Sequence, residues 1–210
     1  QGSDEEFRSF FCRFQFSVAM FVLPLGVGIF CFRDFLTDLL LGDQWRDAAL
    51  MMGCWGLSTG VMIVFSHYCS EVFRSKGKPK VSLLCQVLYM CVMVPVLCVS
   101  ASMGFEQLVI ANAVVRVVGI AINQTAMFFV SGISFQAVLK GVMAPLVSSS
   151  VMGCVGLIAV ELAEASWLKC ALGILLCVLV YAASCMAFRN SRRFLIGLFR
   201  GRGMFGNQES

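Results

Sequence analysis

The sequence predicts an all-α protein built as a polytopic transmembrane helix bundle with about six spans. Hydrophobic residues make up 59 % of the 210 residues and charged residues only 13 %, whereas a soluble domain carries about 25 % charged residues. The apolar residues also gather in six long runs that are almost free of charge. Each run is long enough to cross a hydrocarbon core of about 30 Å as a helix.

The predicted spans are residues 14–32, 48–68, 81–102, 108–130, 141–160 and 168–188. Short loops join them, so consecutive helices are expected to be antiparallel within a single membrane domain that covers residues 1–210. The residues after the last span, 189–210, form a basic tail. Its arginines and apolar residues suit either an interfacial helix or a simple positive end to the last span.

Lysine and arginine residues are distributed unequally between the two sides of the predicted bundle. Of the sixteen, twelve lie on one side: Arg8, Arg13, Arg74, Lys76, Lys78, Lys80, Lys140, Arg189, Arg192, Arg193, Arg200 and Arg202. Arg33, Arg46 and Lys169 lie on the other side, and Arg116 lies inside a span. Because loops rich in Lys and Arg stay on the cytoplasmic side, both ends of the chain are predicted to be cytoplasmic.

The first span and the segment after it contain the most distinctive residues. Pro24 lies inside an apolar helix, and the span is followed by LLLGDQW, which contains Gly42 and Trp45. Trp45 suits an interfacial anchor because its indole is apolar in body and polar at the N–H. The combination of Pro24, Gly42 and Trp45 resembles the polysaccharide-type lipid flippases. These O-antigen and exopolysaccharide translocases belong to the multidrug/oligosaccharidyl-lipid/polysaccharide flippase superfamily.

The resemblance implies a multi-pass protein of the bacterial cytoplasmic (inner) membrane that flips a polyprenyl-diphosphate-linked oligosaccharide for surface polysaccharide biosynthesis. It also implies two lobes that rock around a central cavity, as in other repeat-built carriers. Six spans supply one lobe, so this chain is expected to be the carboxy-terminal part of a longer protein. Its expected partners are the missing N-terminal lobe, membrane lipids and the lipid-linked oligosaccharide.

Two alternative functions remain open at this point. A drug or small-solute exporter of the same superfamily would share the architecture but require an intramembrane carboxylate for cation coupling. An integral-membrane glycan transferase or ligase would use carboxylates outside the membrane, and the candidates are Asp34, Asp38, Asp43 and Asp47. These four are spaced four or five residues apart, so a helix would place them near one face.

The fourth span carries the candidate substrate site. Asn112, Arg116 and Asn123 share one stripe of a helix that turns about 100° per residue, with Gly119 expected to clear space between them. Arg116 lies about 15 Å beyond Glu106 along the helix, near the middle of the bilayer, where an arginine costs about 2.5–3.5 kcal/mol. Its guanidinium matches phosphate in a bidentate fork, and the asparagines suit sugar hydroxyls. The alternative role is a structural contact between helices.

The second span adds weaker candidates. Thr59 and Ser66 fall on one side of it together with Trp55, and His67, the only histidine, is a candidate proton relay. Its glycines Gly53, Gly56 and Gly60 are predicted to bring two helices close together, as are Ser149, Gly153 and Gly156 in the fifth span.

Several classes of site are not expected. The eleven cysteines form no C-x-x-C pair and mostly lie inside apolar runs, so neither a metal site nor a disulfide framework is predicted, and no cofactor is implied. The net charge of +4 comes from short loops and the tail, which is a topological pattern and not a nucleic-acid-binding surface. No Asp or Glu lies within the predicted spans, so we expect a transporter and not an enzyme.

Overall fold

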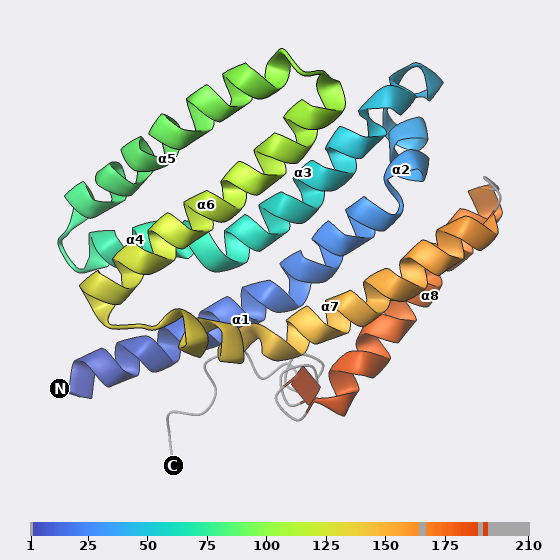
Figure 1. The fold of residues 1–210 in the computed structure, drawn as a ribbon. Coiled ribbons are helices and arrows are strands. Elements are labelled where there is room, and N and C mark those ends of the chain that lie inside the picture. Colours follow the sequence, from blue (N-terminus) through green and yellow to red (C-terminus); the bar gives the residue numbers. More distant parts are fainter. Residues whose placement is uncertain (1, 164–166, 189–190, 193–210) are drawn as a thin grey trace.

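A computed structural model describes residues 2–163, 167–188 and 191–192. Apart from short turns, these residues are helical (Figure 1). The elements are α1 (Gly2–Cys31), α2 (Arg33–Leu40), η1 (Asp43–Ala48), α3 (Ala49–Met62), η2 (Ile63–His67), α4 (Tyr68–Ser75), α5 (Pro79–Ala101), α6 (Phe105–Ser131), α7 (Phe135–Ala163) and α8 (Trp167–Ala187). Within the described residues, 6 helical stretches are long and apolar enough to cross a membrane. The prediction of an all-α, multi-pass membrane protein is confirmed.

The helices extend beyond the predicted apolar runs. The second spanning stretch is continuous from Asp43 to Ser75, and the fifth begins at Phe135, six residues before its predicted start. Helical hydrogen bonding continues past the apolar run into the polar ends, where pairs such as Arg74 with Glu71, 3.3 Å apart, support the last turn. The predicted basic tail lies outside the described residues, apart from positions 191–192.

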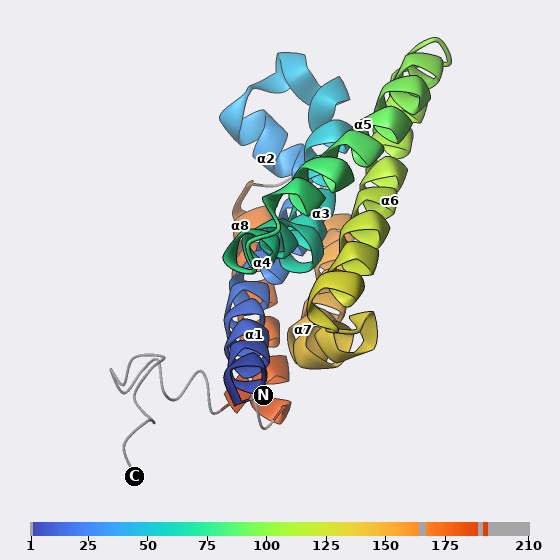
Figure 2. The ribbon, with the colours of Figure 1, turned by 90° about the vertical axis from the view of Figure 1, so that its left-hand side faces the viewer.

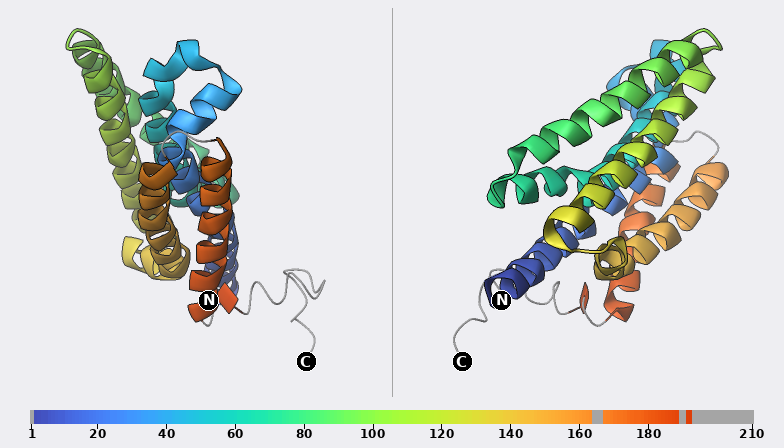
Figure 3. Two further views of the ribbon diagram at one scale, coloured as in Figure 1. Left: turned by 90° about the vertical axis from the view of Figure 1, so that its right-hand side faces the viewer. Right: turned by 60° about the vertical axis from the view of Figure 1, so that its left-hand side comes forward.

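Helix α1 lies at the centre of the arrangement, between α3 and α7 (Figures 1 and 2). Helices α5 and α6 pair with each other beyond α3, and α8 runs alongside α7 (Figure 3). We call the end that carries η1 and the α5–α6 turn the η1 end, and the end where α1 begins the opposite end. Helices α3 and α6 both run from the η1 end to the opposite end, which makes them parallel.

Glycines allow the backbones of α1 and α3 to touch. A Cβ atom on Gly26 would lie 3.1 Å from the carbonyl oxygen of Gly56, and one on Gly60 would lie 3.3 Å from the carbonyl oxygen of Val22. A Cβ on Gly53 would meet the side chain of Arg33 at 2.8 Å. The glycine stripe of α3 therefore serves close helix packing, as the sequence indicated.

The start of α1 joins the turns at the opposite end of the bundle. The guanidinium of Arg8 donates to the carbonyl oxygen of Ser131 at 2.9 Å, where α6 ends in Gly132 with a left-handed φ of 64°. The ammonium of Lys76 lies 5.7 Å from the centre of the Phe7 ring. A cation at the last carbonyls of α6 also complements the helix dipole. Basic residues from the α4–α5 turn and from α1 thus meet at one end of the molecule.

Pro24 in α1 has a specific partner in α8. Proline has no N–H, so the carbonyl of Met20, four residues earlier, has no helical donor. The hydroxyl of Tyr181 donates to that carbonyl oxygen at 2.7 Å. A tyrosine from another helix therefore satisfies the carbonyl that the proline leaves free.

We expect Tyr181→Phe to lower the free energy of unfolding by about 1–3 kcal/mol, because the Met20 carbonyl then lacks a donor in an apolar environment. The matched control is the same change in a Pro24→Ala background, where the alanine N–H bonds to Met20 and most of the loss should disappear. Thermal unfolding of the four proteins in detergent measures the coupling. Equal losses in both backgrounds would contradict this pairing.

Candidate functional site

Arg116 of α6 faces α3 and contacts two of its residues. Its Nη1 donates to the hydroxyl of Thr59 at 2.6 Å, and its Cζ lies 5.6 Å from the centre of the Trp55 ring. Trp55 and Thr59 are four residues apart on α3, so both point toward α6. The structure therefore brings two of the candidate residues, Arg116 and Thr59, together and places the aromatic ring of Trp55 beside them.

The positive charge of Arg116 has no anionic neighbour within the described part of the chain. No carboxylate there lies within 4.0 Å of the guanidinium, and its hydrogen bond to a side chain goes to the neutral Thr59 hydroxyl. A hydroxyl and the quadrupole of one indole compensate a desolvated cation only partly. Arg116 does tie α3 to α6, yet this contact uses only one edge of its fork of donors.

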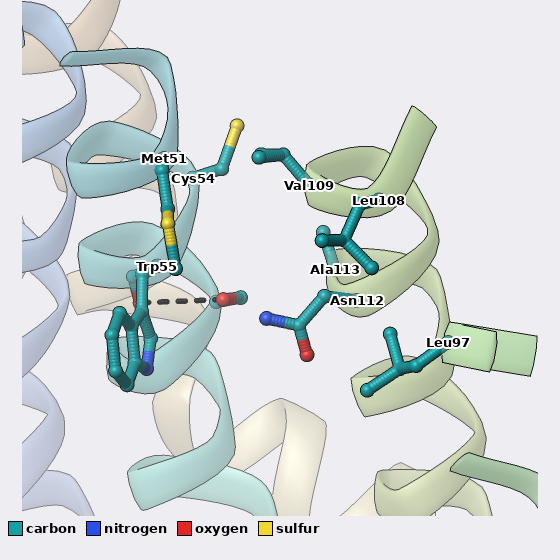
Figure 4. A pocket seen from close by; sticks show the side chains of 9 residues that line it. Met51, Cys54, Trp55, Leu97, Leu108, Val109, Asn112 and Ala113 are labelled. Carbon is teal, nitrogen blue, oxygen red and sulfur yellow. Dashed lines mark hydrogen bonds between the residues drawn. The ribbon is translucent and has the colours of Figure 1, made fainter. Parts of the chain in front are cut away.

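A cavity of about 190 Å³ lies between α3, α5 and α6, on the η1 side of Arg116. Its walls are formed by Met51, Cys54, Trp55, Ser58, Leu97, Leu108, Val109, Asn112 and Ala113. Figure 4 shows the amide of Asn112 extending from α6 toward Trp55 on α3, across the space between the helices. Asn112 precedes Arg116 by one helical turn, so an amide and a guanidinium follow each other along this wall.

A second hollow of about 440 Å³ lies on the other side of Trp55, between α1, α3 and the α2–η1 segment. Its lining is almost entirely apolar and consists of Ile29, Leu41, Ala48, Met51, Met52, Trp55, Gly56 and Thr59. Trp55 and Met51 line both hollows, and the Trp55 side chain is 51 % exposed. The Trp55 indole thus lies between the cavity that contains Asn112 and the apolar hollow, and the Arg116 guanidinium lies beside the indole.

The space that Gly119 was expected to clear between Asn112, Arg116 and Asn123 is filled by a neighbouring helix. The ring of Tyr89 in α5 occupies this place, and a Cβ on Gly119 would lie 2.8 Å from its Cδ2 atom. A glycine on a membrane helix accepts a neighbouring side chain as readily as a ligand. Asn123 is also engaged within its own helix, since its amide donates to the Gly119 carbonyl at 3.0 Å.

Ser66 and His67 lie apart from Arg116. Ser66 is only 3 % exposed and lines neither hollow, while His67 is exposed on the bundle surface. Both belong to η2, a π-helical turn with more residues per turn than an α-helix. The α-helical spacing that placed Ser66 on the same side as Thr59 therefore fails after Met62.

The segment with the family-like residues forms the η1 end. Gly42 has a φ of 87°, which only glycine adopts easily, and it turns the chain from α2 into η1. Trp45 is exposed there, as an interfacial anchor would be. Arg46 lies 2.9 Å from Asp38 and 3.7 Å from Asp43, and Arg33 lies 3.9 Å from Asp34, so three of the four carboxylates considered for a transferase pair with an arginine.

Comparison with known proteins finds similarity in this part of the chain. Residues 1–50 match a family model described as polysaccharide biosynthesis protein. The matched stretch contains Pro24, Gly42 and Trp45, on which the resemblance to flippases depends. No curated protein and no solved structure matches the chain. The matched residues include α1, α2, all of η1 and the first two residues of α3, so the similarity covers the helix at the centre of the bundle.

Proposed function

We propose that this multi-pass membrane protein takes part in surface polysaccharide biosynthesis by moving a polyprenyl-diphosphate-linked oligosaccharide across the bacterial cytoplasmic membrane, as part of a longer flippase. The observation that carries the proposal is Arg116, a cation within a membrane helix whose aromatic neighbour Trp55 lines the cavity and whose guanidinium has no described carboxylate within 4.0 Å. The match of residues 1–50 to a polysaccharide biosynthesis family supports the class of substrate.

The surroundings of Arg116 suit a diphosphate. Thr59 holds one edge of the guanidinium and Trp55 covers one side of it, which restricts its orientation before a ligand arrives. The remaining N–H groups form a planar fork that pairs with two phosphate oxygens. Asn112, one turn away along the cavity wall, supplies an amide that can donate to and accept from a sugar hydroxyl.

Binding to the chain in lipid nanodiscs tests the proposal. We expect a short-chain polyprenyl-diphosphate saccharide to bind, polyprenyl diphosphate without sugar to compete, and a neutral glycolipid to compete poorly. Competition by lipophilic cations with no effect of diphosphates would favour the drug-exporter alternative. Hydrolysis or transfer of the saccharide in the same samples would favour the transferase.

The proposed direction of transport requires the opposite end of the bundle to lie in the cytoplasm. Basic residues of that end come from α1 and the α4–α5 turn, including Arg8, Lys76 and Lys78. We expect a cysteine at position 78, in a cysteine-depleted chain, to react with an impermeant maleimide only after the membrane is permeabilised. A cysteine at position 43 is the matched control and should react from outside. External labelling at position 78 would reverse the orientation.

A further inference from the structure

The spanning stretch that contains α3 is interrupted by the five-residue π-turn η2, Ile63–His67. In a π-turn the backbone N–H donates to the carbonyl five residues earlier, in place of the carbonyl four residues earlier as in an α-helix. Such turns occur mostly singly within α-helices and frequently at functional sites. The π-turn begins one helical turn after Thr59, the hydroxyl partner of Arg116. Any change in its conformation would therefore move α4 relative to the Arg116 site.

Two glutamines from different helices donate to carbonyl oxygens of the π-turn. Nε2 of Gln15 in α1 donates to the Val64 carbonyl at 2.8 Å, and Nε2 of Gln124 in α6 donates to the Phe65 carbonyl. Both side chains are deeply buried, with 2 % of Gln15 and 6 % of Gln124 exposed. Buried amides are costly in an apolar core unless they are hydrogen-bonded, so these two bonds offset the cost of burying the NH2 group of each glutamine.

The Gln124 bond and the Arg116 bond join the same two helices. Gln124 follows Arg116 by eight residues on α6, and Phe65 follows Thr59 by six residues along the α3 stretch. Because the two helices are parallel, these bonds are successive cross-links in one direction. Sliding α3 by one residue would displace Thr59 by about 1.5 Å and break its short bond to the guanidinium.

We propose that Gln124 is a positioning residue for the Arg116 site, acting through the π-turn, and that Gln15 supports it from α1. The amide of Gln124 fixes the register of α3 against α6, and this register places the Thr59 hydroxyl against Arg116. The π-turn presents the Phe65 carbonyl to the amide. The ligand part of this inference rests on the proposed function, whereas the cross-link itself stands on the contacts alone.

The test measures the Kd of inorganic diphosphate for the full chain in nanodiscs, together with thermal stability. We expect Gln124→Leu, similar in size but without a donor, to raise Kd about tenfold in protein that remains folded. Thr125→Val is the matched control, because the Thr125 hydroxyl only bonds to the Ala121 carbonyl of its own helix. A Gln124→Leu protein with lowered stability and unchanged Kd would overturn the positioning role.

A second readout separates this inference from the proposed function. If the wild-type chain and Arg116→Ala bind diphosphate equally, the ligand assignment fails, and the cross-link is then judged by the reactivity of Cys69. This thiol is 2 % exposed and lies just after the π-turn. With the other cysteines replaced, we expect Gln124→Leu to speed maleimide labelling of Cys69 about tenfold by loosening the π-turn. Unchanged labelling would overturn the cross-link.

Discussion

Arg116→Ala is expected to accumulate normally in the membrane and to lose ligand binding and transport. Hydrogen bonds to a charged group contribute about 1.5–3 kcal/mol, so binding of the lipid diphosphate should weaken about 10- to 100-fold. Removal of a cation that lacks a described carboxylate partner leaves no buried counter-charge behind, and the fold should tolerate it. Binding in nanodiscs and surface polysaccharide in cells carrying the intact protein measure the two losses.

Two further variants show whether Arg116 acts through its charge or through its planar fork. Arg116→Lys should retain part of the activity, because an ammonium keeps the charge but cannot pair with two oxygens in one plane. Asn123→Ala should have a smaller effect than either change, since the Asn123 amide already bonds to the Gly119 carbonyl. If Arg116→Ala instead lowers abundance and melting temperature along with activity, the residue is a structural tie between α3 and α6.

The second large effect is expected for Gly26→Leu in α1. Its Cβ would lie 3.1 Å from the Gly56 carbonyl oxygen and 3.6 Å from the Gly60 Cα, so a leucine must push α1 and α3 apart. We expect a loss of about 3 kcal/mol or more, because backbone on the other side cannot rotate away as a side chain does. The melting temperature and the monodisperse fraction in detergent report this loss.

Gly28→Leu is the matched control for Gly26→Leu. It places the same side chain in the same helix two residues later, where a Cβ would meet nothing within 4 Å. Its effect on stability should stay within about 0.5 kcal/mol, as for most surface substitutions. Equal destabilisation by the two variants would show that helix propensity or insertion, and not the contact between α1 and α3, sets the cost.

The sequence by itself determined the fold class, the number of spanning helices and the packing role of the α3 glycines. These properties depend on composition, on the length of the apolar runs that cross the lipid, and on the spacing of residues along one helix. It also made Arg116 a candidate site residue, because a charge deep in an apolar run is costly wherever its neighbours lie.

Only the tertiary structure decided which helices are neighbours and what fills the space between them. Helical spacing in α6 could not show that the Tyr89 ring of α5 covers Gly119, because the sequence of one helix does not determine which other helix packs against its glycines. α-helical spacing along α3 also could not predict which way Ser66 points. The π-turn changes the number of residues per turn, and therefore the direction of every later side chain. The contact between Trp55 and Arg116 likewise depends on tertiary structure, because it forms only when α3 lies beside α6.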